Sequence, residues 1–214
     1  MKKILLYCCF FFLNGSVVAQ EMIGIALNPP DTNRGLPVMK ALLHRASARQ
    51  FDTTDLNLQD LSDLLWAANG INRPGSGKRT APSALNAQDI DVYIFMKQGV
   101  YLYDAASHFL QPVRKGNQRQ LFAGRNPGDP IAPVICVLVS DISRFTRGEE
   151  SNRLVWAAED AGIVSQNISL FCAAVGLDTR PRAGMPLEKI RELLNLKESQ
   201  HPMLNQPVCN KPTR

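Results

Sequence analysis

Residues 149–177 read EESNRLVWAAEDAGIVSQNISLFCAAVGL. This stretch contains no proline, and its apolar residues recur at helical spacing, which predicts one long helix. One broad face collects Leu154, Ala158, Ala161, Ile168, Phe171 and Val175. Further apolar residues widen that face until little polar surface remains, which is typical of a helix buried in a large core or in a subunit interface.

Two features of this stretch do not fit a plain core helix. Glu159 and Asp160 stand side by side near its middle, and Gly162 follows them. A helix loses about 1 kcal/mol at glycine relative to alanine. Gly162 is therefore either a tolerated defect, or a place where something large and flat lies against a backbone that a Cβ would block.

The start of the chain indicates export. Lys2 and Lys3 precede the apolar run Ile4–Leu13, and small residues end at Ala19. These are the parts of a secretory signal peptide over 1–19, and ten apolar residues are too few to span a bilayer. A lipid anchor at Cys8 is disfavoured because only four apolar residues precede it. We therefore expect an exported, periplasmic protein of a bacterium, with no membrane attachment after cleavage.

The rest of the chain has the size of one domain. Of its 214 residues, 24 are Lys or Arg and 19 are Asp or Glu, and loss of the two signal lysines lowers the net charge from +5 to +3. Such a mild excess, without a nucleic-acid-binding motif, argues against a nucleic-acid partner. Cys136 and Cys172 fall in apolar segments and read as core residues, whereas a disulfide that involves Cys209 stays open.

Two basic segments invite a phosphate-binding interpretation. Arg45 and Arg49 flank Ser47 in RASARQF, so two guanidinium groups and a hydroxyl can converge on one anion. The same residues would also suit the solvated C-terminal end of a helix. The segment Gly75–Thr80 resembles a phosphate loop, but position 72 is Asn where the motif needs Gly, so we expect an ordinary mobile loop over 70–81.

The remaining pattern predicts helices first and strands later. After an irregular segment at 20–35, helices are expected at 36–45, with its apolar stripe inward, and at 57–68, with Asn57 as its cap. A short helical turn is expected at 82–88, strands at 91–96, 99–103, 108–113 and 133–139, and short helices at 117–123 and 186–194. The tail 204–214 has one short apolar stretch at 207–209 and a basic end, and no element is assigned to it. This order predicts an α+β fold with helices packed on a mostly antiparallel sheet.

Common catalytic chemistry lacks support in the sequence. The three histidines, His44, His108 and His201, show no metal-ligand spacing, and no GxSxG motif is present. Glu159 and Asp160 would point about 100° apart on a helix, so they do not form an acid–base pair. The sequence therefore predicts no metal and no catalytic residue.

Three separated stretches, RASARQF, APSALNAQ and EDAGIVSQNISLFCAAVGLDT, together resemble the nitroreductase family of FMN-dependent oxidoreductases. The segment GVYLYDAASHFLQPV is most similar to the branch of SagB-type dehydrogenases. The resemblance covers about Leu36 to Pro212 and implies one FMN-binding domain over 36–214, an α-β-α sandwich that contains the long buried helix. It also implies a homodimer with both active sites at the interface.

The resemblance implies a set of cofactor-binding residues. Arg45, Ala46, Ser47 and Arg49 would hold the FMN phosphate, and Lys211 would complete that site. The segment with Pro82, Ser83, Ala84 and Asn86 would touch the flavin across the dimer interface, and Ala161 and Gly162 would lie at the edge of its ring system. The chain departs from the family pattern at Asp89, where proline is common, and in its tail, PVCNKP.

The implied activity is the transfer of two electrons, as hydride at flavin N5, to a nitro, quinone or similar conjugated acceptor. Alternatives are a flavin- or small-ligand-binding module without turnover, and a SagB-like azoline dehydrogenase, although the latter enzymes work beside cyclodehydratase partners. Export complicates the choice of electron donor, because NAD(P)H is a cytoplasmic reductant.

Overall fold

The computed structural model describes residues 22–124 and 129–211. The predicted signal peptide lies outside the described residues. Among these residues, seven strands form one sheet in the order β1-β6-β5-β4-β7-β9-β8, with every neighbouring pair antiparallel. The strands of this sheet are β1 (Ile25–Ala26), β4 (Ile90–Phe95), β5 (Gly99–Asp104), β6 (Phe109–Lys115), β7 (Val134–Asp141), β8 (Leu177–Thr179) and β9 (Gln200–Asn210).

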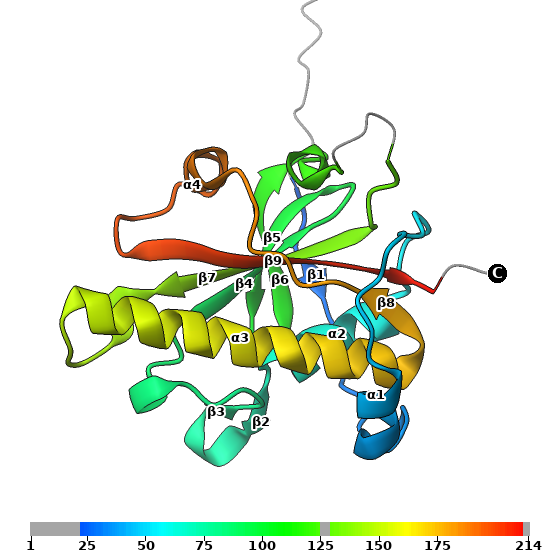
Figure 1. Cartoon of the computed structure of the whole chain (residues 1–214), viewed down its shortest axis with the longest axis horizontal. Coiled ribbons are helices and arrows are strands. Elements are labelled where there is room, and N and C mark those ends of the chain that lie inside the picture. Colours follow the sequence, from blue (N-terminus) through cyan, green and yellow to red (C-terminus); the bar gives the residue numbers. More distant parts are fainter. Residues whose placement is uncertain (1–21, 125–128, 212–214) are drawn as a thin grey trace, which may run out of the picture.

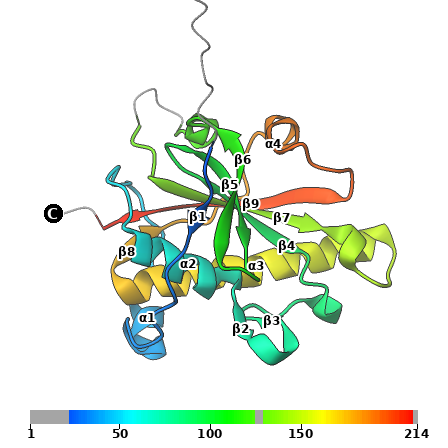
Figure 2. The ribbon, with the colours of Figure 1, turned by 180° about the vertical axis from the view of Figure 1, so that it is seen from behind.

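Helices cover both faces of this sheet (Figures 1 and 2). On one side lie α1 (Val38–His44), α2 (Leu58–Asn69) and α3 (Glu150–Val175), and on the other side lies α4 (Leu187–Leu194). Four short 3-10 segments join these elements: η1 (Pro74–Ser76), η2 (Ala84–Asn86), η3 (Arg119–Phe122) and η4 (Ile142–Arg144). The predicted α+β class and α-β-α sandwich are confirmed.

The centre of the sheet is β7, whose residues 134–140 are all buried. Such an unbroken apolar strand is expected where both faces of a sheet are covered. One core lies between the sheet and the helices α2 and α3, and a second core lies under α4. Cys136, Cys172 and Cys209 are all buried and free, so none of the three forms a disulfide.

Helix α3 runs across one face of the sheet along most of its width (Figure 1). It ends at Gly176, whose φ of 81° is a left-handed conformation that glycine adopts without strain. Its side away from the sheet is open: Val155 is 56% exposed, and Ala158, Glu159, Gly162 and Gln166 are also exposed. The predicted all-round burial of this helix is therefore incomplete within one chain.

The predicted apolar stripe of α1 is exposed, not buried. Only Ala41 of this helix is buried, whereas Met39 is 73% and Leu43 is 79% exposed. The stripe prediction failed because α1 packs edgewise on the end of α3, where its Leu36 N–H bonds to the Ala174 carbonyl. Helix α1 consequently presents apolar side chains outward.

Helix α2 begins as predicted. Asn57 Oδ1 accepts from the Asp60 backbone N–H at 2.8 Å, and Asn57 Nδ2 donates to the Asp60 carboxylate at 2.7 Å. The segment 22–35 is mostly irregular, but it contributes β1 and packs on α2 through Arg34. The Arg34 guanidinium forms salt bridges with Asp60 at 2.6 Å and Asp63 at 2.9 Å.

Two predictions of irregular structure were wrong. The segment 70–81 is a small hairpin of β2 (Ile71–Arg73) and β3 (Lys78–Arg79) and not an open loop. The tail forms β9, an eleven-residue strand that pairs with β7 and β8. Pro202 and Pro207 masked this strand, because proline removes a ladder donor and argues against an interior strand.

No helix within residues 22–124 and 129–211 is long and apolar enough to cross a bilayer.

Candidate functional site

The loop that follows α1 lies beside β8. Ser47 pairs with Thr179 in an isolated parallel bridge, and the Ala48 N–H donates to the Thr179 carbonyl at 2.9 Å. These bonds hold the predicted anion-binding motif at the C-terminal end of α3. Ser47 and Thr179 are far apart in the sequence. They become neighbours because α3 crosses the sheet and ends beside the loop that follows α1.

A cavity of about 260 Å³ opens where this loop, α3 and the tail meet. We call it the smaller cavity, and its lining residues are His44, Ala46, Ser47, Ala48, Arg49, Ser169, Cys172, Ala173, Gly176, Leu177, Asp178, Thr179 and Lys211. The predicted residues Ala46, Ser47, Arg49 and Lys211 therefore share one concave surface. Arg45 is exposed and does not line this cavity.

In the smaller cavity, side chains favour a bound anion, whereas the nearby helix ends do not. The C-terminal ends of α1 and α3 carry partial negative charge, and Asp178 adds a carboxylate. Arg49 and Lys211 offset these charges, and the Ser47 hydroxyl is a compact donor. A phosphate fits this residue set, with the two cations and the hydroxyl as its ligands.

Cys172 lines the smaller cavity but does not supply a nucleophile. Burial raises the pKa of its thiol well above the ordinary value, so it stays protonated. Within the described parts of the chain, no group of three or more His, Cys, Asp or Glu side chains is placed to hold a metal ion. The cavity therefore offers binding groups and no covalent chemistry of its own.

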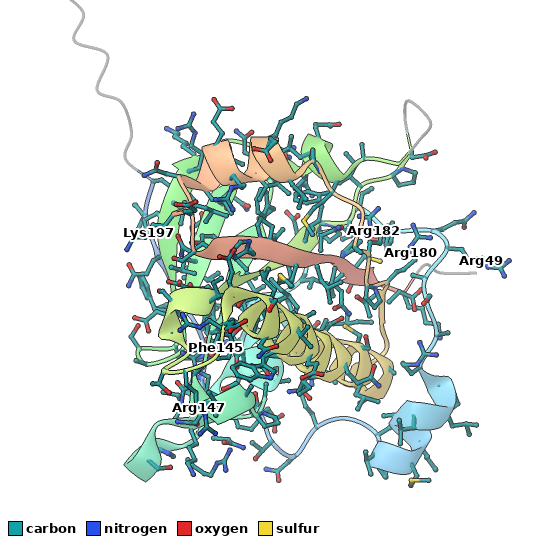
Figure 3. All side chains as sticks on the ribbon, turned by 60° about the vertical axis from the view of Figure 1, so that its left-hand side comes forward. Arg49, Phe145, Arg147, Arg180, Arg182 and Lys197 are labelled. Atoms are coloured by element: carbon teal, nitrogen blue, oxygen red, sulfur yellow. The ribbon has the colours of Figure 1, made fainter. Side chains whose placement is uncertain are left out.

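A larger cavity of about 610 Å³ lies on the other side of Arg49. Its walls are Arg49, Gln50, Phe51, Asp52, Phe122, Gly124, Asp129, Pro130, Ile131, Ala132, Ile135, Arg180, Arg182 and Pro207. Arg49 lines both cavities, so the two form neighbouring parts of one candidate site. Figure 3 places Arg49, Arg180 and Arg182 at the same end of the molecule, with Lys197 at the other end.

Arg180 and Arg182 were not among the predicted site residues. The sequence did hold a signal, because Arg180-Pro181-Arg182 places two cations directly after the segment that ends the long helix. Strand β8 ends directly before Arg180, and its ladder to β9 directs the following residues toward the larger cavity.

The second predicted segment, 82–88, packs on the middle of α3. The Ala84 N–H donates to both carboxylate oxygens of Asp160, at 3.0 and 2.9 Å, and the Gln88 N–H donates to Ser83 Oγ at 2.8 Å. Leu85, Asn86 and Gln88 have φ of 55°, 54° and 49°. Left-handed conformations are costly for such residues and cluster at functional sites, so Asp160 holds a strained loop in place.

Asp89, the departure from the family pattern, faces this loop from the core. It is fully buried, and its Oδ2 accepts from the Ser140 hydroxyl. Its Oδ1 has no hydrogen-bond partner among the described residues. Burial, and next the neighbouring Asp160 carboxyl, raise the pKa of Asp89 to about 7. A proton held between Asp89 and Asp160 would satisfy the unpartnered oxygen.

Ala161 and Gly162 stand apart from both cavities. Ala161 is fully buried in the core between α3 and the sheet, so its side chain is not accessible to a ligand in this chain. Gly162 is exposed, and a Cβ added there would meet no atom of this chain within 4 Å. That both residues lie beside the flavin stays a prediction. The burial of Ala161 in this chain does not support it for that residue.

The two predicted halves of the site are separated along α3. Asp160, which holds the 82–88 segment, precedes Cys172 of the smaller cavity by 12 residues, or about 18 Å of helix. The chain therefore brings Ala46, Ser47 and Arg49 of the first motif together with Lys211, but not Arg45. It does not bring the segment 82–86 to the same cavity.

An antiparallel sheet between helical layers, with a cationic cavity at the end of its longest helix, defines a nitroreductase-like α+β protein. Comparison with known sequences agrees. The sequence profile of the nitroreductase family matches residues 42–208, so the chain belongs to the nitroreductase family, whose members are flavin-dependent oxidoreductases.

Individual relatives support the same assignment. The chain is 28% identical over 179 residues to "Putative nitroreductase MJ1384" of Methanocaldococcus jannaschii, over 79% of this chain and 89% of that protein. A crystal structure of a "putative nitroreductase" from Ralstonia eutropha JMP134 is 34% identical, with a TM-score of 0.83, over 89% of this chain and 90% of that one. The Escherichia coli microcin synthetase McbBCD complex contains a chain of similar fold, 20% identical, with a TM-score of 0.70 over 94% of this chain and 80% of that one.

Proposed function

We propose that this chain is an exported FMN-dependent oxidoreductase that passes two electrons from a donor to a nitro, quinone or similar conjugated acceptor. One observation carries the proposal: Ser47, Arg49 and Lys211 line one cavity, and Arg49 also borders a second cavity large enough for a small molecule. Membership of a flavin-dependent family supports the same assignment.

In this proposal the residues of the smaller cavity hold the FMN phosphate. Lys211 and Arg49 supply positive charge, Ser47 supplies a hydroxyl donor, and exposed Arg45 adds long-range attraction. Arg49 extends to the border with the larger cavity, where a guanidinium stabilises negative charge on a ring system. When bound, the flavin supplies hydride transfer, which the protein side chains cannot perform.

Acceptor chemistry would take place in the larger cavity. Reduction of a nitro group to a nitroso group consumes two electrons and two protons and releases one water. Phe51, Phe122 and Ile135 form apolar walls there, and they exclude water from a conjugated acceptor. No described side chain needs to form a bond with the substrate in this scheme.

We further propose that the functional unit is a homodimer. Exposed Val38, Met39 and Leu43 on α1 and exposed Val155 on α3 provide apolar surface for a second copy. The strained 82–88 segment lies about 18 Å along α3 from the smaller cavity, so a second copy could deliver it to that cavity. Open space around Gly162 leaves room for close approach of a second copy.

The first test of the proposal is flavin binding by the purified protein. We expect gel filtration after incubation with FMN to give a yellow protein with one FMN per chain. We also expect dithionite to bleach the bound flavin and a nitroaromatic acceptor to restore its colour without air. A protein that retains no flavin would contradict the proposal, and bound flavin that never cycles would favour a non-catalytic binding role.

The proposed periplasmic location has its own test, because residues 1–19 lie outside the described residues. N-terminal sequencing of the protein from cells should begin at about Gln20. An intact Met1 would contradict export and would restore NAD(P)H as the expected donor.

A further inference from the structure

We infer that the larger cavity selects acceptors that carry a carboxylate, through Arg180 and Arg182. This inference rests on the proposed function, because it names the substrate class of the same site. The predicted phosphate site is the smaller cavity, so the two arginines are not needed for the flavin phosphate.

The two guanidinium groups flank one aromatic ring. The Arg180 guanidinium carbon lies 5.6 Å from the centre of the Phe51 ring, and that of Arg182 lies 6.0 Å from it. Figure 3 shows Arg180 and Arg182 next to one another. A conjugated acid that enters the cavity would meet an aromatic surface and two cations together.

In the described structure, Arg182 hydrogen-bonds to neutral groups, and a buried nitrogen of Arg180 has no partner. Arg182 Nε donates to Asn205 Oδ1 at 3.1 Å, and Arg182 Nη2 donates to the Phe122 carbonyl at 3.4 Å. Arg180 Nε is buried without a hydrogen-bond partner among the described residues. Burial and the like charge of Arg180 lower the pKa of Arg182. Neither arginine forms a salt bridge within the described residues, so an anion that binds between these two like charges would lower their mutual repulsion.

The acidic residues of the cavity have other neighbours. Asp52 Oδ1 accepts from the Thr54 N–H at 2.7 Å, which turns this carboxylate toward its own loop. The Asp129 carboxylate lies against Gly124, where an added Cβ would meet it. Neither Arg180 nor Arg182 forms a salt bridge with Asp52 in the described structure. The cavity therefore keeps a net positive charge on the wall that carries Phe51.

A carboxylate is the anion that this wall suits best. A guanidinium fork matches two carboxylate oxygens in a bidentate way, whereas a bulkier anion would compete with Phe51 for space. The cavity volume of about 610 Å³ accommodates a single-ring conjugated acid. The probes are therefore 4-nitrobenzoate and 4-nitrobenzamide, which share the ring and the nitro group and carry a carboxylate or a neutral amide of similar size opposite it.

The test compares these probes on the full-length, FMN-loaded protein and on Arg180→Gln. We expect wild type to show a KM for 4-nitrobenzoate about tenfold below that for the amide, the effect of one charged hydrogen bond. Arg180→Gln should remove that preference and leave the FMN dissociation constant unchanged. Lys197→Gln, at the other end of the molecule, makes the same charge change and should preserve the preference.

Calorimetry with benzoate and benzamide separates this inference from the proposed function. If the protein binds no FMN, the proposed function fails, but tighter binding of benzoate than of benzamide would still support the anion site. Equal affinity for the two compounds would overturn the inference even if Arg180→Gln fails to fold. A variant that loses FMN and keeps the substrate preference would also overturn it.

Discussion

The middle and the C-terminal end of helix α3 carry different parts of the candidate site. At the C-terminal end, Ser169 and Cys172 close a cavity that also contains Arg49 and Lys211. In the middle, Asp160 holds the backbone of Ala84, and the surface around Gly162 is open. The first region is a finished concave surface, whereas the second is a strained, convex one.

This difference shows that one chain completes only one of the two parts of the candidate site. A ligand is bound in a cavity, and at the C-terminal end of α3 all the walls of that cavity come from the same chain. The 82–88 segment, which packs on the middle of α3, has costly left-handed conformations at Leu85, Asn86 and Gln88, and the cavity beside it holds only about 10 Å³. Strain of this kind persists when it has a use, and a second copy of the chain would provide one.

The largest expected effect comes from Gly162→Leu. In a two-fold interface each substitution occurs twice, so overpacking would cost about 2–6 kcal/mol of dimer stability. The isolated chain should fold as well as before, since leucine favours a helix over glycine by about 1 kcal/mol. Analytical ultracentrifugation should detect the shift to monomer, and FMN binding should fall with it.

The control is Gly162→Ala, which adds only a methyl group where this chain leaves open space. It should weaken the dimer less than leucine does. A leucine variant that stays dimeric and binds FMN normally would show that the middle of α3 is ordinary solvent-facing surface.

The next effect concerns the C-terminal end of α3. Arg49→Ala should weaken FMN binding about 10- to 150-fold, because a charged hydrogen bond contributes about 1.5–3 kcal/mol. Both arginines are exposed, but only Arg49 lines the cavity, so Arg45→Ala removes the same charge from outside it and should cost less than about 1 kcal/mol. Fluorescence titration of FMN gives both constants, and equal losses would contradict the smaller cavity as the phosphate site.

The smallest effect is a pH dependence in the middle region. The pKa of Asp89 is raised from 3.8 to about 7 in the folded chain. Its contribution to the unfolding free energy is present below about pH 4 and is lost as pH rises through about 7. Asp89→Asn removes this titration, so its stability relative to wild type should rise by on the order of 2 kcal/mol from pH 5 to pH 8.

Urea unfolding of both proteins at each pH measures that difference. Groups remote from Asp89, such as His108 and His201, are present in both proteins and largely cancel. Asp160 titrates together with Asp89, so the difference reports the titration of the pair. Parallel stability curves would mean that Asp89 is ionised in the folded state and shares no proton with Asp160.

Much of the fold follows from local patterns. The long helix, the β5–β6 hairpin, the central strand β7 and the Asn57 cap were predictable, because hydrophobic spacing and capping chemistry act over a few residues. Of the predicted phosphate-site residues, Ala46, Ser47, Arg49 and Lys211 do line one cavity, whereas Arg45 does not. Whether they bind FMN stays a prediction.

The missed features depend on contacts between distant residues. Strand β9 contains Pro202 and Pro207 and buries the polar residues Asn205 and Gln206. Such a sequence does not predict an interior strand. Its polar side chains are satisfied elsewhere in the fold: Ser165 donates to Gln206 at 2.7 Å, and Asn205 donates to the Arg182 carbonyl at 3.1 Å. Burial of such groups is affordable only where these partners exist.

The sequence by itself determined the helices and strands with strong periodicity, the family, and the residue types that could hold a phosphate. Only the tertiary structure decided that Arg49 borders two cavities, that Arg180 and Arg182 face the larger one, and that the 82–88 segment lies away from both. The physical reason is distance along the chain. Spacing over a few residues sets local conformation, whereas a cavity forms where segments more than a hundred residues apart in the chain pack together.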